Sequence, residues 1–220
     1  MGGLLHEDDR VAALLATLRA PHRAMLDEVI GVAADRIGRQ YRSESPFDKL
    51  VGRILRTETG ADIAFLPGVG YGVSLNPGPI TREALATLLP HTPGIVTLSL
   101  TGAQVMELLE QSAANQAPAD DMDGVGGLIQ TDGLQWAADL RRPVGARIGP
   151  VRIDSQLLNP AREYRVVTHA GLLGGLHRYR TFAAGRDIQR RDRSVGEAVV
   201  ASFRTASVVR APAIGDVQLT

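Results

Sequence analysis

The chain has 220 residues, a formal net charge of +0, 44% hydrophobic residues and 22% charged residues, which is typical of an ordered protein with one large or two small domains. A neutral balance argues against a partner that is nucleic acid or an anionic membrane. The chain has no cysteine, which excludes disulfides and thiolate metal ligands, and it has no apolar run as long as a membrane span.

The N-terminal half is predicted to begin with two amphipathic helices. Over residues 8–20, Val11, Leu14, Leu15 and Leu18 recur at helical spacing before Pro21. A clearer helix is predicted over 45–60, where Ser45 is the N-cap and Gly60 follows the last turn.

The following segments alternate between strand and helix patterns. Residues 61–66 predict a strand and 67–79 a glycine-rich loop, after which 81–89 predict a helix, 95–100 a strand and 101–116 a helix with a capping box. Further strands are expected over 128–137, 147–154 and 163–169, and a last helix over 194–206. This order predicts a mixed α+β fold.

The sequence contains few of the motifs that carry chemistry. The loop has glycines at 68, 70 and 72, but it matches neither the dinucleotide fingerprint nor the phosphate-binding loop. The five histidines lack metal-ligand spacing, and no nucleophile elbow is present. Lys49 is the only lysine among 24 basic residues, so we attribute the many arginines to coding bias and discount any single one that no motif places.

Three stretches in this order are distinctive: "SESPFDKLVGRILRTETGADIAFL", "GPITREALATLLPHTPGIVTLSLTGAQVMELLEQS" and "YRVVTHAGLLGGLHRYRTF". Together they resemble the C-terminal domain of the 5'-nucleotidase family of two-metal phosphoesterases. The resemblance implies a layered α/β sandwich of mixed sheets flanked by helices. It also implies a separate N-terminal metallophosphatase domain that holds two divalent metals, whose motifs this chain lacks, while the C-terminal domain recognises the substrate.

The glycine-rich loop departs from the family pattern. Nucleotidases typically have Asn-Gly-Gly-Gly-Ile-Arg here, and the arginine contacts the substrate phosphate. This chain has Pro67-Gly68-Val69-Gly70-Tyr71-Gly72, which is more similar to the thiosulfohydrolase branch, although that branch usually has arginine at the position of Gly70. The resemblance makes Gly68, Gly70, Tyr71 and Asn76 candidate substrate-binding residues.

The second recognition motif is also altered. The family has Gly-Gly-Asp-Gly followed by an aromatic residue, with the aromatic ring on the base and the acid on the ribose. Here Gly174 and Gly175 precede Leu176-His177-Arg178-Tyr179, and the other stacking aromatic would fall near Leu128. Candidate site residues implied by the resemblance are therefore Leu128, His177 and Tyr179, and Arg178 or Arg180 is a candidate to replace the charge of the missing loop arginine. The lost arginine, worth roughly 1.5–3 kcal/mol as a charge-assisted contact, predicts weakened nucleotide binding.

Three interpretations remain open. The first is a substrate-recognition domain, inactive alone, which acts on a nucleotide or small anion with the missing N-terminal domain. The second is a ligand- or partner-binding module that has lost nucleotide recognition, or the equivalent domain of a thiosulfohydrolase-like enzyme. The third is a complete small hydrolase. The resemblance implies that residues 1–40 form a linking helix and lead-in segment and residues 41–220 the recognition domain. It also implies that the apolar face of the helix over 8–20 packs on the body of this domain. The sequence leaves the compartment open, and the resemblance favours a periplasmic or extracellular location for the full-length protein.

Overall fold

The computed structural model describes residues 8–220, which are built around one five-stranded mixed sheet with the strand order β12-β6-β11-β3-β7. Strands β3 and β11 are parallel, and the other neighbours are antiparallel. The bounds of these strands are β3 (Ile63–Gly68), β6 (Gly94–Thr101), β7 (Gly127–Asp132), β11 (Glu163–His169) and β12 (Arg186–Ser194). The α+β class expected from the element order is confirmed.

Short strands extend the structure at both ends of the central sheet. One small sheet has the order β13-β1-β5, and three strand pairs are β2–β4, β8–β14 and β9–β10. Their bounds are β1 (Val29–Ala33), β2 (Ile37–Gly38), β4 (Ser74–Leu75), β5 (Gly78–Thr81), β8 (Trp136–Ala138), β9 (Arg152–Ile153), β10 (Gln156–Leu157), β13 (Val208–Val209) and β14 (Val217–Leu219). The α-helices are α1 (Asp9–Arg19), α2 (Arg23–Leu26), α3 (Pro46–Thr59), α4 (Arg82–Leu88), α5 (Gly102–Gln116), α6 (Ala170–Leu173) and α7 (Val195–Ala206), and the 3₁₀ turns are η1 (Ala20–His22), η2 (Asp121–Asp123), η3 (Leu176–Arg178) and η4 (Arg180–Ala184).

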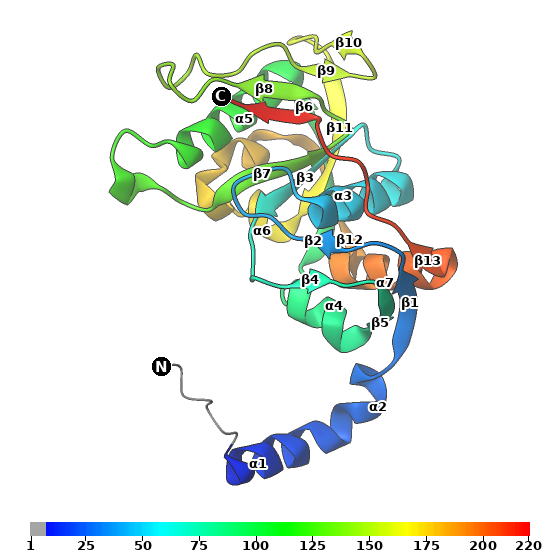
Figure 1. The fold of residues 1–220 in the computed structure, drawn as a ribbon. Helices are drawn as coiled ribbons and strands as arrows, with labels where there is room; N and C mark the ends of the chain where they lie inside the picture. The colour runs from blue at the N-terminus through cyan, green and yellow to red at the C-terminus, as the bar shows by residue number, and fades with distance from the viewer. Residues whose placement is uncertain (1–7) are drawn as a thin grey trace.

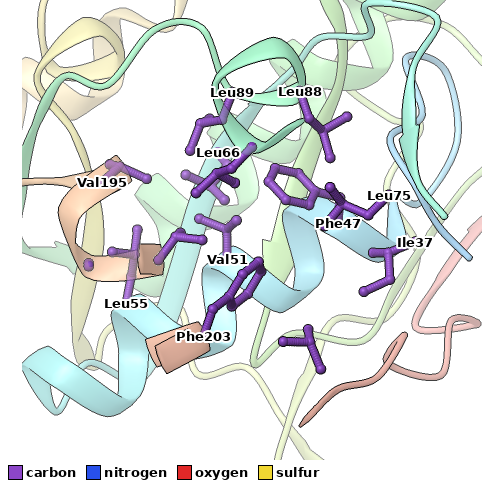
Figure 2. Close-up of a cluster of buried hydrophobic side chains, with 14 of the residues drawn as sticks. Ile37, Phe47, Val51, Leu55, Leu66, Leu75, Leu88, Leu89, Val195 and Phe203 are labelled. Atoms are coloured by element: carbon purple, nitrogen blue, oxygen red, sulfur yellow. The ribbon is translucent and has the colours of Figure 1, made fainter. Parts of the chain in front are cut away.

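The central sheet separates two hydrophobic cores because its strands alternate their side chains between faces. Ala64 and Leu66 of β3 face the core that α3, α4 and α7 cover, whereas Ile63 and Phe65 face the core that α5 and α6 cover. Figure 2 shows the first core, with side chains of α3 and α7 meeting those of β3 and α4. The layered sandwich expected from the resemblance is therefore confirmed.

The helix starts follow the capping signals in the sequence. The Ser45 side chain accepts a hydrogen bond from the Asp48 amide at the start of α3, and α5 begins with the capping box of Thr101 and Gln104. Gly60 ends α3 in the left-handed region, with φ 66°. These caps satisfy backbone groups that a helix terminus leaves without intrahelical partners, so the boundaries of α3 and α5 were predictable from local sequence.

One predicted strand needs correction, and one strand was not predicted. The expected strand over 147–154 is mostly irregular, with only Arg152–Ile153 in β9. Conversely, the charged stretch "RDIQRRDRS" forms β12, the exposed edge strand that pairs with β6. Charged side chains suit an edge strand because they discourage pairing with another chain. Because nearly all residues of β12 are polar, its sequence lacks the apolar–polar alternation by which a strand is recognised.

The expectation that the apolar face of α1 packs on the body of the domain is wrong. Helix α1 projects away from the sheets (Figure 1), and Val11, Leu14, Leu15 and Leu18 are 52–62% exposed. Its end is held by ion pairs from Arg19 to Asp27 and Glu83. Helical spacing predicted the apolar stripe correctly, but it carries no information about which surface covers that stripe. Within residues 8–220, no helix has the length and apolarity needed to cross a membrane.

A buried ionic cluster attaches the C-terminal segment to α3. The Lys49 ammonium pairs with Glu44 and Asp216, and the other Glu44 oxygen accepts hydrogen bonds from the Gly215 and Asp216 amides. The Lys49 side chain is only 4% exposed. Burial opposes its charge, but hydrogen bonds to Asp216 and Glu44 prevail and raise the Lys49 pKa. The cluster thus stabilises the approach of β14 to β8.

Gly68, the first glycine of the loop, is required because the neighbouring backbone leaves no room for a Cβ atom. A Cβ atom at Gly68 would collide with the backbone of Leu128 and lie 2.6 Å from the carbonyl carbon of Gly127, whereas one at Gly70 would meet the Tyr41 Cβ at 3.4 Å. We therefore expect Gly68→Ala to destabilise the protein by about 1–3 kcal/mol through overpacking, and Gly70→Ala to change stability by less than about 0.5 kcal/mol. Urea unfolding of both variants measures this, and equal effects would contradict the assignment.

Candidate functional site

A partly enclosed cavity lies at the carboxyl ends of the parallel strands β3 and β11. Its volume is about 90 Å³, and its walls come from α3, the loop after β3, the segment after α4, the end of β11, η3 and the start of α7. The carboxyl ends of parallel strands are where ligands commonly bind in open α/β sheets. This cavity is therefore the candidate functional site.

A buried ion pair forms one wall of the cavity. Arg39 Nη2 lies 2.8 Å from Asp48 Oδ1, and Arg39 Nε donates to the same carboxylate at 3.0 Å. The two side chains are 5% and 1% exposed. Ser45 Oγ donates to Asp48 at 2.6 Å. Burial raises the pKa of Asp48, and the contacts with Arg39 and Ser45 oppose that rise.

The Arg39 guanidinium also contacts two aromatic rings. Its central carbon is 5.5 Å from the Phe47 ring centroid and 5.5 Å from that of Tyr71. Both distances allow cation–π attraction. Because Tyr71 belongs to the glycine-rich loop, Arg39 connects the position of that loop to the first turn of α3.

His169 is the second polar wall of the cavity. It is the last residue of β11 and the N-cap of α6, and its Nδ1 accepts a hydrogen bond of 3.0 Å from the Gly171 amide. The neutral ring must therefore carry its proton on Nε2. Burial, with smaller contributions from the charges of Arg39 and His177, lowers the pKa of His169 to about 4. His169 is thus a neutral hydrogen-bond donor at physiological pH.

Two aromatic side chains stand at the mouth of the cavity. Tyr71 is 41% exposed, and its ring centroid is 6.3 Å from that of His91 at an interplanar angle of 67°. Both residues line the cavity. Gly72, next to Tyr71, has φ 71°, a conformation that glycine adopts without steric cost.

The candidates from the glycine-rich loop lie at different depths. Tyr71 lines the cavity, Gly68 is buried at the end of β3, and Gly70 is exposed beside Tyr41. Asn76 is exposed just after β4. The structure thus brings Tyr71 to the cavity, and ligand contacts by the other three residues stay predictions.

The candidates from the second motif surround a strained turn. His177 and Arg178 both have positive φ, 53° and 65°. The His177 ring packs against Gly126, and its Nδ1 is buried without a hydrogen-bond partner among residues 8–220. Burial lowers the His177 pKa. Arg178 is exposed and lies 3.4 Å from an Asp123 oxygen.

The two candidate stacking positions are in the core. Leu128 and Tyr179 are each 0% exposed, and Tyr179 packs edge-on against Phe182 at 6.3 Å between ring centroids. Burial raises the pKa of Tyr179 to about 12. In this arrangement both side chains contact protein, so their role in ligand binding stays a prediction.

Several cavity residues were not found from the sequence. These are Arg39, Asp48, His91 and His169. Arg39 is one of the many arginines attributed to coding bias, and Asp48 lies in the first turn of α3, where an acidic residue is ordinary. The position of His169 at the end of the predicted strand over 163–169 was a usable signal, because strand ends carry functional side chains in such sheets.

The described residues do not bring together the side chains of a metal site. Across residues 8–220, no group of three or more histidine and carboxylate side chains could hold a metal ion. Asp48, the carboxylate in the cavity, already accepts hydrogen bonds from Arg39 and Ser45. The cavity thus combines this occupied carboxylate with the Arg39 guanidinium, the His169 imidazole and apolar walls.

Comparisons with known proteins agree with this architecture. The family model described as "5'-nucleotidase, C-terminal domain" matches residues 29–184. The trifunctional nucleotide phosphoesterase protein YfkN of Bacillus subtilis (strain 168) is 29% identical over 128 residues, which are 56% of this chain and 8% of that protein.

Solved structures share the fold at low identity. A 5'-nucleotidase precursor from Thermus thermophilus has a TM-score of 0.84 at 24% identity, covering 97% of this chain and 43% of that one. The sulfate thiohydrolase SoxB from the same species, in complex with glycerol, has a TM-score of 0.86 at 24% identity. The match covers 98% of this chain and 39% of the SoxB chain. The chain thus spans less than half the length of each of these relatives.

Proposed function

Because this chain belongs to the 5'-nucleotidase C-terminal domain family, we propose that it is the substrate-recognition domain of a 5'-nucleotidase-like phosphoesterase. In this proposal it holds a nucleotide or a related small anion while a separate N-terminal domain supplies two divalent metals and the catalytic groups. The segment that precedes β1, which contains α1, links the two domains in this proposal. The chain alone does not catalyse hydrolysis.

The observation that carries the proposal is the cavity that contains Arg39, Tyr71 and His169. A buried guanidinium, a neutral imidazole donor and an exposed aromatic ring together can hold an oxygen-rich group and a flat or apolar group. Arg39 also offers a cation near the loop from which the family's arginine is missing. Its side chain comes from a different segment, just after β2.

Calorimetric titration of the chain with AMP, adenosine and thiosulfate tests the proposal. We expect saturable binding of one of these ligands. Tyr71→Ala should weaken that binding by about 1–3 kcal/mol if the ring stacks on the ligand. Tyr41→Ala is the matched control, since Tyr41 is 42% exposed and Tyr71 41%, and it should leave binding unchanged.

Turnover measurements test whether the chain is inactive alone. With p-nitrophenyl phosphate and added divalent metal, we expect the chain to release no more product than buffer does, since no group of three ligating side chains gathers within residues 8–220. Turnover that a chelator abolishes would contradict the proposal and favour a complete small hydrolase.

A second candidate function is the recognition domain of a thiosulfohydrolase-like enzyme. The run Pro67-Gly68 followed by Tyr71-Gly72 favours it. Binding of thiosulfate without binding of AMP or adenosine would support this alternative. If AMP, adenosine, thiosulfate and phenyl phosphate all fail to bind, the chain is a partner-binding module that has lost ligand recognition.

A further inference from the structure

The size of the cavity limits the group that it can enclose. A volume of about 90 Å³ has room for roughly six to nine water-sized groups at about 10–15 Å³ each. A single ring, which a closed cavity of about 150 Å³ encloses fully, fits here with part of it in the open mouth. A complete nucleoside, with a base and a ribose, is considerably larger.

The walls of the cavity are mostly apolar. Val51, Leu66, Val69, Leu89 and Leu176 contribute side chains from five different segments. A hydrated phosphate or sulfate dianion would lose its water against these side chains, and such a loss is costly unless charged partners replace it. An apolar body is therefore a better occupant than the anion itself.

The polar atoms that remain available are hydrogen-bond donors. Arg39 uses three of its five N–H groups on Asp48 and the Leu88 carbonyl. The Nε2–H of His169 has no hydrogen-bond partner among residues 8–220, whereas its Nδ1 is occupied by the Gly171 amide. A ligand that fits these walls must present an acceptor, such as the oxygen of an ester or alcohol.

The positions where the family resemblance places nucleoside contacts are filled by protein. Leu128 and Tyr179 have no exposed surface, and the His177 ring covers Gly126. The open cavity lies beside this turn, bounded by Leu176. Binding of a base between two aromatic faces would require both buried positions to open.

We infer that the cavity binds the alcohol part of a phosphate ester, or of a related small-anion ester, whose alcohol is small and mostly apolar, in place of a nucleoside. The apolar body lies among Val51, Leu66 and Leu89, and its oxygen accepts from His169 and Arg39. Tyr71 covers the mouth, and the charged group of the ester remains outside. This inference rests on the proposed function, since it names the substrate class of the same site.

Competitive calorimetry with phenyl phosphate and AMP tests the inference. Phenyl phosphate is the probe because its single ring and ester oxygen match the volume and the donors of the cavity. We expect it to bind the chain at least tenfold more tightly than AMP does. The His169 ring protons, followed by nuclear magnetic resonance, should shift on saturation with phenyl phosphate.

Three variants localise the binding. His169→Phe keeps a ring of similar size but lacks the donor, so it should weaken phenyl phosphate binding roughly three- to tenfold, as expected for one hydrogen bond. Tyr71→Ala should weaken it about tenfold, and Tyr41→Ala by less than twofold. Equal losses in the two tyrosine variants, or an unchanged affinity in His169→Phe, would overturn the assignment of the cavity.

The outcomes separate this inference from the proposed function. If AMP binds as tightly as phenyl phosphate or more tightly, the inference is overturned and substrate recognition by this domain still stands. If neither phenyl phosphate, AMP, adenosine nor thiosulfate binds, both are overturned. Circular dichroism of each variant confirms that it is folded before its affinity is compared.

Discussion

Replacement of Arg39 by methionine is expected to destabilise the protein by about 3–5 kcal/mol, because it leaves Asp48 as a buried carboxylate without its cation. Asp48 is 1% exposed, and Arg39 supplies its closest charged contact, at 2.8 Å. The variant also loses the guanidinium that contacts the Phe47 and Tyr71 rings. The free energy of unfolding in urea measures the effect.

Two control variants make this prediction specific. Arg39→Met combined with Asp48→Leu removes both charges, so it should recover much of the lost stability. Arg36→Met changes an exposed arginine three residues earlier, whose Nη2 donates to Ser74, and should cost less than about 0.5 kcal/mol. A loss in the double variant as large as in Arg39→Met would show that packing, and not the unpaired charge, dominates.

Stability should fall as the pH is lowered from about 6.5 to about 4 because of His169. Its pKa is about 4 in the folded protein against an ordinary value of 6.5, so in this window the unfolded chain binds a proton that the folded chain excludes. The contribution is fully present above pH 6.5 and lost below pH 4. It amounts to roughly 3 kcal/mol at about 1.4 kcal/mol per pKa unit. Urea unfolding at a series of pH values measures it.

Two histidine variants separate the contribution of His169 to this pH dependence from the contribution of carboxylates. His169→Gln should show a flatter dependence of the unfolding free energy on pH between 4 and 6.5 than the parent chain. His22→Gln, at an exposed position in η1, should reproduce the dependence of the parent. If His169→Gln retains the full slope, other groups cause the pH dependence.

The parts of the fold that local signals determine were predictable from the sequence. Ser45, Gly60 and Thr101 defined the limits of α3 and α5, because caps act within one turn of the chain. Strand β12 was not predictable in this way. Its sequence lacks the alternation of apolar and polar residues that marks a half-buried strand. The strand forms because its backbone pairs with the free edge of β6.

The candidate site was only partly predictable, because its polar residues acquire their roles by burial. Tyr71 was identified from the loop sequence. Arg39 is one of many arginines in the chain, and nothing adjacent to it in sequence indicates that its side chain would be buried with Asp48. Likewise, the tautomer of His169 depends on the turn after β11, in which the Gly171 amide donates to Nδ1.

The ionic cluster of Lys49 has a practical consequence for chemical labelling. Since the chain has one lysine and its side chain is 4% exposed, reagents that acylate primary amines meet a protected ε-amine while β14 remains in place. Detachment of the C-terminal segment exposes that amine. The rate of its acylation therefore reports how often this segment opens, a local motion that an average over the whole molecule would not resolve.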